Sequence, residues 1–156
     1  MPDIGGIERV KRFVAQKGLD TAIQELDSTT RSSALAAQAL GCSVAEIAKS
    51  VVFCGEQTVV VVISGDRRVD AGKLSKLVGS PLVVASPDEV RMKTGYVIGG
   101  VPPFPHNDRV LVFADSSLAR FDQVWTASGA QNAVMKISTR ALTATIGRPV
   151  QDLAQQ

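Results

Sequence analysis

The chain has 156 residues, of which 45% are hydrophobic, 21% charged and 4% aromatic, and its formal net charge is +2. A chain of this length is expected to fold as one domain over residues 1–156, and its charged fraction excludes a disordered chain. The small net charge does not by itself indicate a nucleic-acid-binding protein, although it allows a local basic patch.

We expect no membrane segment and no secretion signal. The longest purely aliphatic run, Val59–Ile63, is far too short to cross a bilayer, and the first residues lack the basic and apolar regions of a signal peptide. The two cysteines, Cys42 and Cys54, fit no metal-binding spacing, and the single histidine, His106, is not enough to complete a metal site with them. The expected protein is soluble and cytoplasmic, with reduced thiols and no metal.

The first half of the chain alternates helical and strand patterns. Apolar residues at helical spacing precede glycines that can end a helix in the left-handed conformation, and β-branched runs are joined by a short turn. The expected elements begin with a helix that carries Ile7, Val10 and Val14 and ends at Gly18, a strand over 21–26 and a polar loop over 27–33. A helix over 34–40 that ends at Gly41 should follow, and then a short helix that starts at the Ser43–Glu46 capping box and carries Lys49 at its end. The last expected element of this half is a hairpin of strands 51–54 and 58–64. The second hairpin strand is apolar on both faces and should therefore be central.

The second half continues this mixture. The expected elements begin with a turn over 65–68, a helix from Asp70 to Leu77 that Gly79 ends, and a strand over 81–85. A helix that starts at the Ser86–Glu89 capping box, an irregular segment over 94–108 and a strand over 110–114 should follow. The last expected elements are a short turn capped by Asp115, strands over 124–127 and 133–137, and a helix that Ser138 caps and Gly147 ends. There is no regular βαβ repeat. The expected fold class is α/β mixed (α+β), with a single mixed, partly rolled sheet surrounded by helices.

The motifs of the common enzyme classes are missing. The sequence contains no P-loop, no dinucleotide-binding glycine pattern after a strand and no Gly-x-Ser-x-Gly elbow. Nucleophilic catalysis by a side chain therefore has little support, and no cofactor is expected.

Three features of the sequence are candidates for a role in binding or catalysis. Lys49 is either a cation that stabilises a helix C-terminus or a point charge that holds a phosphate. The loop over 94–107 is apolar and rich in glycine and proline, so it either presents rigid backbone groups to a ligand or serves as a buttressing turn. His106, in this loop, either has a structural role or orients a water or a ligand group.

Several segments, in their order and spacing, resemble the YbaK/ProX family, which includes the editing domain of bacterial prolyl-tRNA synthetases. The resemblance covers nearly the whole chain. The segments are Ala36–Gly41, Ile47–Phe53, Val60–Val69, Thr94–Phe104, and Ser128–Gly129 before a closing Leu142.

The resemblance implies a YbaK-like fold and a hydrolase that cleaves the ester of misacylated tRNA without a protein nucleophile, so that water or the substrate itself attacks. It implies that Lys49 engages a phosphate near the terminal adenosine and that a glycine–proline loop holds the aminoacyl end. The catalytic positions implied with Lys49 are Gly99, Gly100, Val101, Pro102 and Pro103, and the substrate-binding positions are Ser50, Thr94, His106, Ser128 and Gly129. Ser50 and residues 104–107 are expected to tune which amino acid is removed.

The expected function is editing in trans. A synthetase pocket for a small apolar amino acid discriminates between amino acids by only about 1–3 kcal/mol per methylene. A second site must therefore remove similar amino acids that have been attached by mistake. With 156 residues the chain lacks room for the catalytic and anticodon-binding domains of a synthetase. We expect a misacylated tRNA as its partner, namely tRNA-Pro carrying Cys, Ala, Ser or Thr, and prolyl-tRNA synthetase is a candidate partner. The alternatives are a non-catalytic module that binds aminoacyl-tRNA or a synthetase, and a small-molecule hydrolase.

The densest basic cluster consists of Arg67, Arg68, Lys73 and Lys76. Part of it is expected to contact the acceptor end of tRNA, because phosphate contacts from Lys and Arg carry most non-specific affinity for nucleic acids. The alternative is a solvated charged face.

Overall fold

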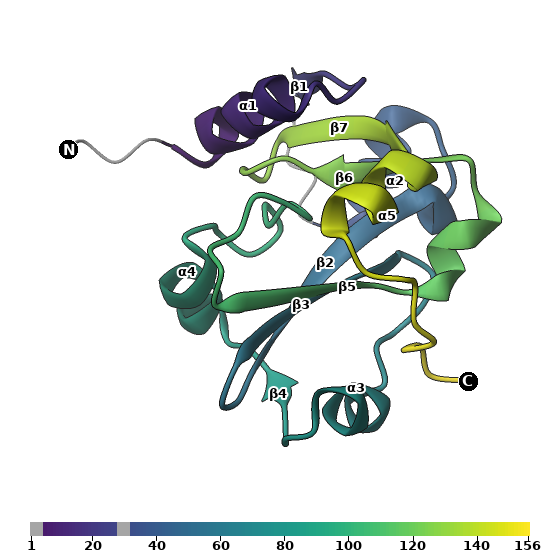
Figure 1. The fold of residues 1–156 in the computed structure, drawn as a ribbon. Coiled ribbons are helices and arrows are strands. Elements are labelled where there is room, and N and C mark those ends of the chain that lie inside the picture. The colour runs from purple at the N-terminus through teal and green to yellow at the C-terminus, as the bar shows by residue number, and fades with distance from the viewer. Residues whose placement is uncertain (1–4, 28–31) are drawn as a thin grey trace.

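A computed structural model describes residues 5–27 and 32–156 and shows helices packed around one sheet (Figure 1). The helices are α1 (Gly6–Lys17), α2 (Ser33–Leu40), α3 (Ala71–Val78), α4 (Pro87–Thr94) and α5 (Thr139–Ile146), with 3-10 turns η1 (Val44–Glu46) and η2 (Ser116–Arg120). The strands are β1 (Ile23–Glu25), β2 (Ile47–Cys54), β3 (Thr58–Ser64), β4 (Val83–Val84), β5 (Val110–Ala114), β6 (Gln123–Ala127) and β7 (Ala133–Ser138). No helix in these ranges is long and apolar enough to cross a bilayer.

The seven strands form one open mixed sheet. Their order is β1-β7-β6-β2-β3-β5, and β4 pairs separately with β2. The β2–β3, β6–β7, β1–β7 and β2–β4 pairs are antiparallel, whereas β6 runs parallel to β2 and β5 runs parallel to β3. The predicted mixed α+β class, with a mixed sheet flanked by helices, is therefore confirmed.

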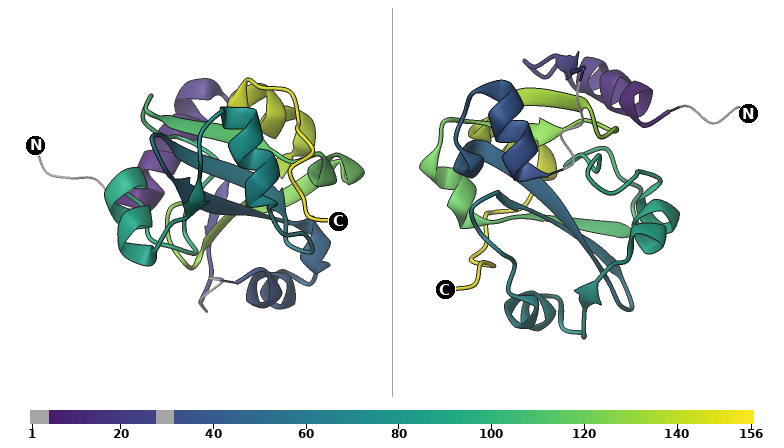
Figure 2. Two further views of the ribbon diagram at one scale, coloured as in Figure 1. Left: turned by 90° about the horizontal axis from the view of Figure 1, so that it is seen from below. Right: turned by 180° about the vertical axis from the view of Figure 1, so that it is seen from behind.

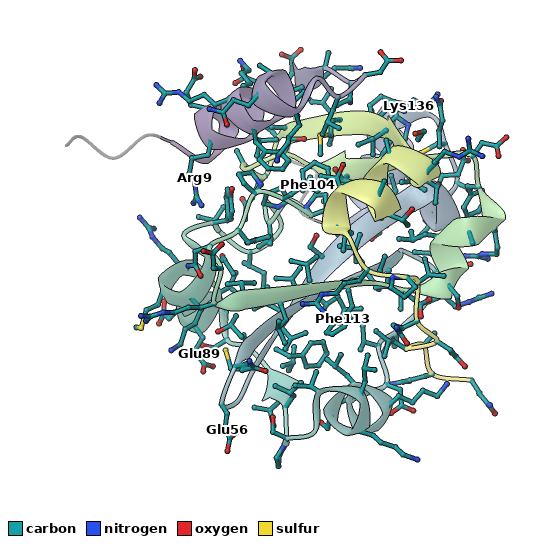
Figure 3. The ribbon with its side chains drawn as sticks, viewed as in Figure 1. Arg9, Glu56, Glu89, Phe104, Phe113 and Lys136 are labelled. Atoms are coloured by element: carbon teal, nitrogen blue, oxygen red, sulfur yellow. The ribbon has the colours of Figure 1, made fainter. Side chains whose placement is uncertain are left out.

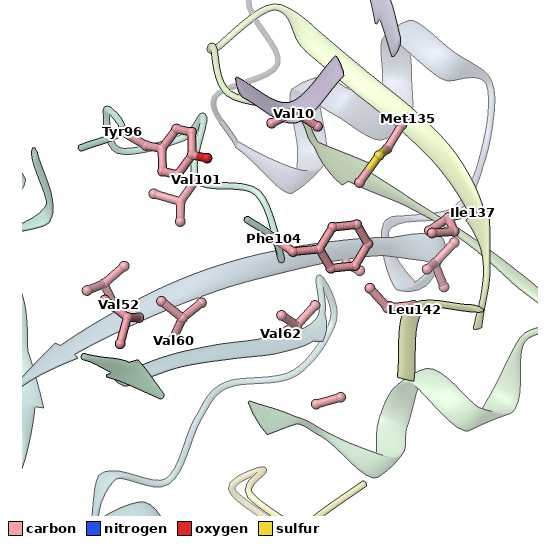
Figure 4. Packing of buried hydrophobic residues seen from close by; sticks show 14 of the residues in the cluster. Val10, Val52, Val60, Val62, Tyr96, Val101, Phe104, Met135, Ile137 and Leu142 are labelled. Atoms are coloured by element: carbon pink, nitrogen blue, oxygen red, sulfur yellow. The ribbon is translucent and has the colours of Figure 1, made fainter. Parts of the chain in front are cut away.

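The central strand β3 separates two halves of the core. Its side chains alternate, because successive residues of a strand point to opposite faces. Val60 and Val62 join the cluster that contains Phe104 and Leu142 (Figure 4), whereas the neighbouring valines join the cluster that contains Phe113. Figure 3 shows Phe104 and Phe113 on opposite sides of β5. The prediction that this strand is covered on both faces is confirmed.

Different elements cover the two sides of β3 and β5. Helices α1 and α5 pack on the side of Phe104, and α3 and the C-terminal segment pack on the side of Phe113 (Figure 2). Leu74 of α3 and Leu153 of the C-terminal segment are both almost fully buried there. The loop over 94–108, which includes Phe104, belongs to the α1 and α5 side.

Capping chemistry fixes most helix boundaries where the sequence predicts them. The hydroxyl or carboxylate of Ser32, Asp70, Ser86 and Ser138 accepts a backbone N–H in the first turn of α2, α3, α4 and α5. Glycines with φ between 62° and 87° follow α1, α2, α3, α4 and α5 at Gly18, Gly41, Gly79, Gly95 and Gly147. Residues 28–31 of the predicted polar loop lie outside the described residues.

The prediction that Lys49 ends a helix is wrong. The Ser43–Glu46 capping box forms, but it starts only one 3-10 turn, and the chain becomes strand β2 at Ile47. Strand β2 then pairs with β3 from Ala48 to Cys54, a long non-local ladder that overrides the local helical pattern. Lys49 is therefore a strand residue, and its interpretation as a cation at a helix C-terminus no longer applies.

Candidate active site

A split in the sheet creates the candidate site. One edge of β2 pairs with β3, while the other edge pairs with β6 only at Ile47–Ala48 and with β4 only at Phe53–Cys54. Between these two short ladders, β2 borders a cavity of about 410 Å³. In Figure 1, β6 and β4 accordingly lie near opposite ends of β2. Backbone groups of a strand that lack a neighbouring strand are available to a ligand.

Lys49 and Ser50 line this cavity from the open edge of β2. The carbonyl of Val52 accepts a hydrogen bond from Ala85 N (2.9 Å), so its backbone polar groups face away from β3. In an antiparallel pair, the backbone N–H and C=O groups of successive residues point alternately toward and away from the partner strand. The backbone groups of Ser50, two residues before Val52, therefore face the same open edge of β2. The site therefore offers backbone as well as side-chain groups at Ser50.

The ammonium group of Lys49 has no ion-pair partner within residues 5–27 and 32–156. Partial burial lowers the pKa of Lys49 below its usual value, the positive charge of Arg68 lowers it further, and Asp66 opposes both effects. Asp66 is itself engaged by Arg120 (2.8 Å) and by Arg67 (3.3 Å). Lys49 is therefore a partly desolvated cation beside a second cation, an arrangement that favours an incoming anion or a polarised oxygen.

The glycine–proline loop, residues 99–103, forms another part of the cavity wall. Gly99 and Val101 line the cavity, and their backbone N–H groups have no hydrogen-bond partner among the described residues. Gly100, Pro102 and Pro103 do not line it. Free N–H groups in a cavity that a partly desolvated lysine also lines can stabilise negative charge that develops on an oxygen during a reaction.

Neighbouring turns hold this loop from behind. The carbonyl of Gly100 accepts a hydrogen bond from Gly129 N (2.9 Å), and the carbonyl of Ile98 accepts one from Gln131 Nε2 (2.9 Å). A Cβ at Gly100 would lie 2.8 Å from the backbone carbon of Ala130, so only glycine fits without displacement. Gly129, predicted to bind substrate, supports the loop and does not line the cavity.

Helix α1 clamps the same loop from the outside. The guanidinium of Arg9 lies 4.4 Å from the centre of the Tyr96 ring, and Figure 3 shows Arg9 reaching from α1 toward the loop. Phe13 packs on Phe104, with ring centres 5.1 Å apart. Burial raises the pKa of Tyr96 to about 12, so its neutral hydroxyl donates to Pro105 O (2.8 Å). The sequence shows no pattern that connects α1 to this loop.

His106 is a partly buried residue of the loop and does not line the cavity. Its Nε2 lies 2.8 Å from the carbonyl of Pro102, and because a carbonyl only accepts, Nε2 carries the proton. Nδ1 has no hydrogen-bond partner among the described residues. Burial lowers the pKa of His106 to about 4, so the ring is neutral at neutral pH. This geometry supports a positioning role for His106.

If His106 positions the loop, replacement of His106 by Gln should lower kcat/KM of the reaction at this site by about tenfold. The pH profile of kcat/KM between about pH 6 and 8 should not change, because His106 does not titrate in this range. A native pKa below the unfolded value of about 6.5 means that the unfolded state binds the proton more tightly. The free energy of unfolding should therefore fall as the pH drops from about 6.5 to 4, and His106→Gln should flatten this fall in urea titrations. An inflection near neutral pH that disappears in the variant would contradict the positioning role.

Two buried hydroxyls near the split lack hydrogen-bond partners among the described residues. They are the Oγ atoms of Ser50, which lines the cavity, and of Ser128, which is fully buried and does not line it. The parallel β2–β6 register joins Ala48 to Thr126, and continuing it by two residues would set Ser50 level with Ser128. Unsatisfied buried hydroxyls are costly and often mark a place for a ligand or water.

Thr94 has a structural environment. Its hydroxyl donates to Val90 O (2.6 Å) and accepts from Tyr96 N (3.1 Å), so it closes the end of α4. Thr94 is buried and does not line the cavity.

The predicted basic cluster is divided. Arg67 pairs with Asp66, and Lys73 binds Asp152 (3.3 Å) and the carbonyl of Ala154 (2.8 Å). Arg68 and Lys76 have no ion-pair partner within the described ranges. Arg68 is the member of the cluster that approaches Lys49.

Several cavity residues carry no recognisable motif. They come from β4, β6 and the start of α2, and include Val84, Ala85, Trp125, Thr126, Ser32 and Ser33. The described part of the chain contains no group of three or more His, Cys, Asp or Glu side chains that could hold a metal ion.

Comparisons with known proteins agree on one family. The model of the aminoacyl-tRNA editing domain matches residues 27–145. Protein YwhH of Bacillus subtilis (strain 168) is 32% identical over 139 residues, which are 88% of each chain. The multifunctional Ser/Thr-tRNA deacylase ProXp-y of Escherichia coli (strain K12) is 27% identical over 124 residues, which are 75% of this chain and 74% of that one.

A solved structure matches over the full length. The crystal structure of a proposed trans-editing enzyme for prolyl tRNA synthetase superposes with a TM-score of 0.89 at 38% identity, covering 99% of this chain and 100% of that one. The family match extends over most of the chain and includes Lys49 and the glycine–proline loop. The resemblance noted from the sequence is confirmed: the chain belongs to the aminoacyl-tRNA editing domain family and is an aminoacyl-tRNA hydrolase.

Proposed function

We propose that this chain acts in trans as a single domain over residues 1–156 and removes a small, wrongly attached amino acid from tRNA-Pro. The observation that carries the proposal is the meeting of the unpaired Lys49 with the free N–H groups of Gly99 and Val101 at one cavity. The full-length likeness to a proposed trans-editing enzyme supports action in trans, with prolyl-tRNA synthetase as a candidate partner.

The geometry supports hydrolysis by positioning and electrostatic stabilisation. Water attacks the ester carbonyl, the bond from the carbonyl carbon to the ribose oxygen breaks, and the ribose oxygen takes a proton. We assign the N–H groups of Gly99 and Val101 to the carbonyl oxygen that becomes negative, and the Lys49 ammonium to the nearby phosphate or ribose oxygens. Such preorganised donors contribute about 3–4 kcal/mol each in well-studied acyl-transfer sites.

The remaining predicted residues are assigned indirect roles, except Ser50. We propose that Thr94, His106 and Gly129 hold the loop, and that Gly100, Pro102 and Pro103 fix its shape. These residues act on the substrate through Gly99 and Val101, because they do not line the cavity themselves.

The unpartnered hydroxyl of Ser50 favours a hydroxyl amino acid among the expected Cys, Ala, Ser and Thr. An oxygen on the substrate side chain would supply the hydrogen bond that Ser50 lacks in the cavity. The relative ProXp-y is named as a Ser/Thr-tRNA deacylase, which agrees with this preference. A site built to hydrogen-bond a substrate hydroxyl discriminates strongly against the analogue without it.

The test is a panel of tRNA-Pro samples charged with Ser, Thr, Ala, Cys or Pro, each incubated with the full chain. We expect rapid hydrolysis of the small non-cognate esters, fastest for Ser and Thr, with Pro-tRNA-Pro spared. Binding without hydrolysis of any member would instead indicate the non-catalytic module, and equal hydrolysis of simple esters would indicate a small-molecule hydrolase.

Replacement of Ser50 by Ala should lower the ratio of kcat/KM for Ser-tRNA over Ala-tRNA by about 10- to 100-fold. It should not lower the free energy of unfolding, because it removes a buried hydroxyl that has no partner. The matched control is Ser64→Ala on β3, whose hydroxyl donates to Ala45 O (2.7 Å) and which should destabilise the protein without changing the ratio. An unchanged ratio in Ser50→Ala would exclude Ser50 as a selectivity residue.

A further inference from the structure

The loop over 94–108 carries the two N–H groups assigned to the carbonyl oxygen, yet its backbone makes few hydrogen bonds. In its middle part, residues 96–105, the backbone-to-backbone hydrogen bonds to described residues are the two made by Gly100. Its N–H donates to Val97 O (2.9 Å), and its carbonyl accepts from Gly129 N (2.9 Å). The position of the two N–H groups therefore depends on the elements that pack against this loop.

The first turn of helix α1 contacts the support of the loop through backbone alone. A Cβ at Gly6 would overlap the carbonyl oxygen of Gly129, and a Cβ at Gly129 would overlap the backbone of Gly6. Gly129 in turn donates its N–H to Gly100 O. Because backbone packs on backbone, no flexible side chain is present to absorb a displacement between α1 and the loop.

The second contact between α1 and the loop is made by Arg9. Its guanidinium lies 4.4 Å from the centre of the Tyr96 ring, an attractive arrangement of a cation over an aromatic face. A Cβ at Gly95 would lie only 2.8 Å from a guanidinium nitrogen of Arg9, so the side chain fits closely over the start of the loop. The hydroxyl of Tyr96 donates to Pro105 O (2.8 Å). Arg9 therefore restrains the residue that joins the two ends of the loop.

Helix α1 is itself fixed to the core. Val10 and Val14 are 0% and 7% exposed, and they belong to the same cluster as Val101 and Phe104 (Figure 4). The ring of Phe13 packs on that of Phe104, with centres 5.1 Å apart. The helix thus contacts the loop near its beginning and near its end, and its own buried face holds it in place.

We propose that helix α1 is a working part of the editing site and that Arg9 is a positioning residue. Arg9 acts on the reaction through Tyr96, which sets where the N–H groups of the loop lie. No residue of α1 lines the cavity, and α1 precedes residues 27–145, which the family model matches. This inference rests on the proposed function, because it uses the assignment of the two N–H groups to the carbonyl oxygen.

Replacement of Arg9 by Gln should lower kcat in single-turnover hydrolysis by about tenfold and leave KM within about twofold, because the loop loses one of several restraints. Arg9→Lys, which keeps a cation over the ring, should restore most of the rate. The matched control is Arg12→Gln, one turn further along α1, which removes the same charge from an exposed residue that lines neither cavity. It should hydrolyse normally. A loss that appears in KM alone would show that Arg9 binds the tRNA and would overturn the positioning role.

A second variant tests the backbone contact. Gly6→Ala should lower kcat by about tenfold or more, because the new Cβ must push the helix away from Gly129. The matched control is Gly5→Ala, whose Cβ would have no atom within 4 Å and which should keep the normal kcat. Urea titrations establish that each variant is folded under the assay conditions. A folded Gly6→Ala protein with normal kcat would show that the first turn of α1 does not position the loop.

The two proposals fail separately, because the amide signals of Gly99 and Val101 report on the loop without any substrate. Arg9→Gln should shift or broaden both signals, whereas Arg9→Lys and Arg12→Gln should leave them in place. If these signals behave so and the unmodified chain hydrolyses no member of the tRNA panel, the proposed function is wrong. If the panel is hydrolysed and Arg9→Gln behaves as Arg12→Gln does, the role of Arg9 is wrong and the proposed function stands.

Discussion

Replacement of Lys49 by Ala is expected to lower kcat/KM for deacylation by at least about 100-fold, because the ammonium holds the phosphate or ribose oxygens next to the reacting ester. The Lys49 side chain lines the cavity, and no ion pair with a described residue competes for its ammonium group. Because burial disfavours the charged form, its removal should leave the free energy of unfolding unchanged or slightly higher. Single-turnover hydrolysis and urea titrations measure the two quantities.

The control for this change is Lys93→Ala on α4, which removes an exposed lysine by the same chemistry. It should leave kcat and KM within about twofold of the unmodified enzyme, as surface charges away from a site usually do. A folded Lys49→Ala protein that hydrolyses normally would show that Lys49 has no direct role.

The lowered pKa of Lys49 gives this role a pH signature. Activity that needs the ammonium falls as the pH rises through the pKa of Lys49, which is lower than for a free lysine because of burial and Arg68. Arg68→Gln removes the neighbouring positive charge and raises that pKa, so the alkaline fall should move to higher pH. Rates must be corrected for spontaneous ester hydrolysis at each pH.

Local chemistry explains how much of this fold the sequence could predict. Ser86 with Glu89 and Ser138 before α5 cap helices by contacts within four residues, and Gly79 ends α3 by its own conformation. The aliphatic run of β3 likewise indicates a strand buried on both faces without knowledge of its neighbours. Lys49 was misplaced because its strand is imposed by pairing with β3, a contact between distant parts of the chain.

The candidate site was predictable only where its residues form a motif. Lys49 with Ser50, and the loop around Gly99, are recognisable in the sequence, and the structure brings them to one cavity. The walls from β4 and β6 have no such pattern, because they depend on how β2 splits from its neighbours. Helix α1 precedes the segment that the family model matches, yet its Arg9 packs on Tyr96 in the loop.

Replacement of Gly100 by Ala should lower kcat/KM by about 100-fold, even though Gly100 does not line the cavity. A Cβ at this position would lie 2.8–3.0 Å from the backbone of Ala130, which cannot move as a flexible side chain does. The loop must shift, and the hydrogen bond from Gly129 N to Gly100 O must lengthen. A displacement near 1 Å is enough to cost about 100-fold when reacting groups are misplaced.

The same clash should lower the free energy of unfolding by about 1–3 kcal/mol, as overpacking usually does. The matched control is Gly72→Ala in α3, where the nearest atom to the new Cβ is a side-chain oxygen of Asp70 at 3.2 Å. Alanine is the better helix former, so Gly72→Ala should be neutral or stabilising by up to about 1 kcal/mol and should leave kcat/KM unchanged. If Gly100→Ala remains fully active, the N–H groups of Gly99 and Val101 do not depend on this loop position, and their assignment to the carbonyl oxygen must be abandoned.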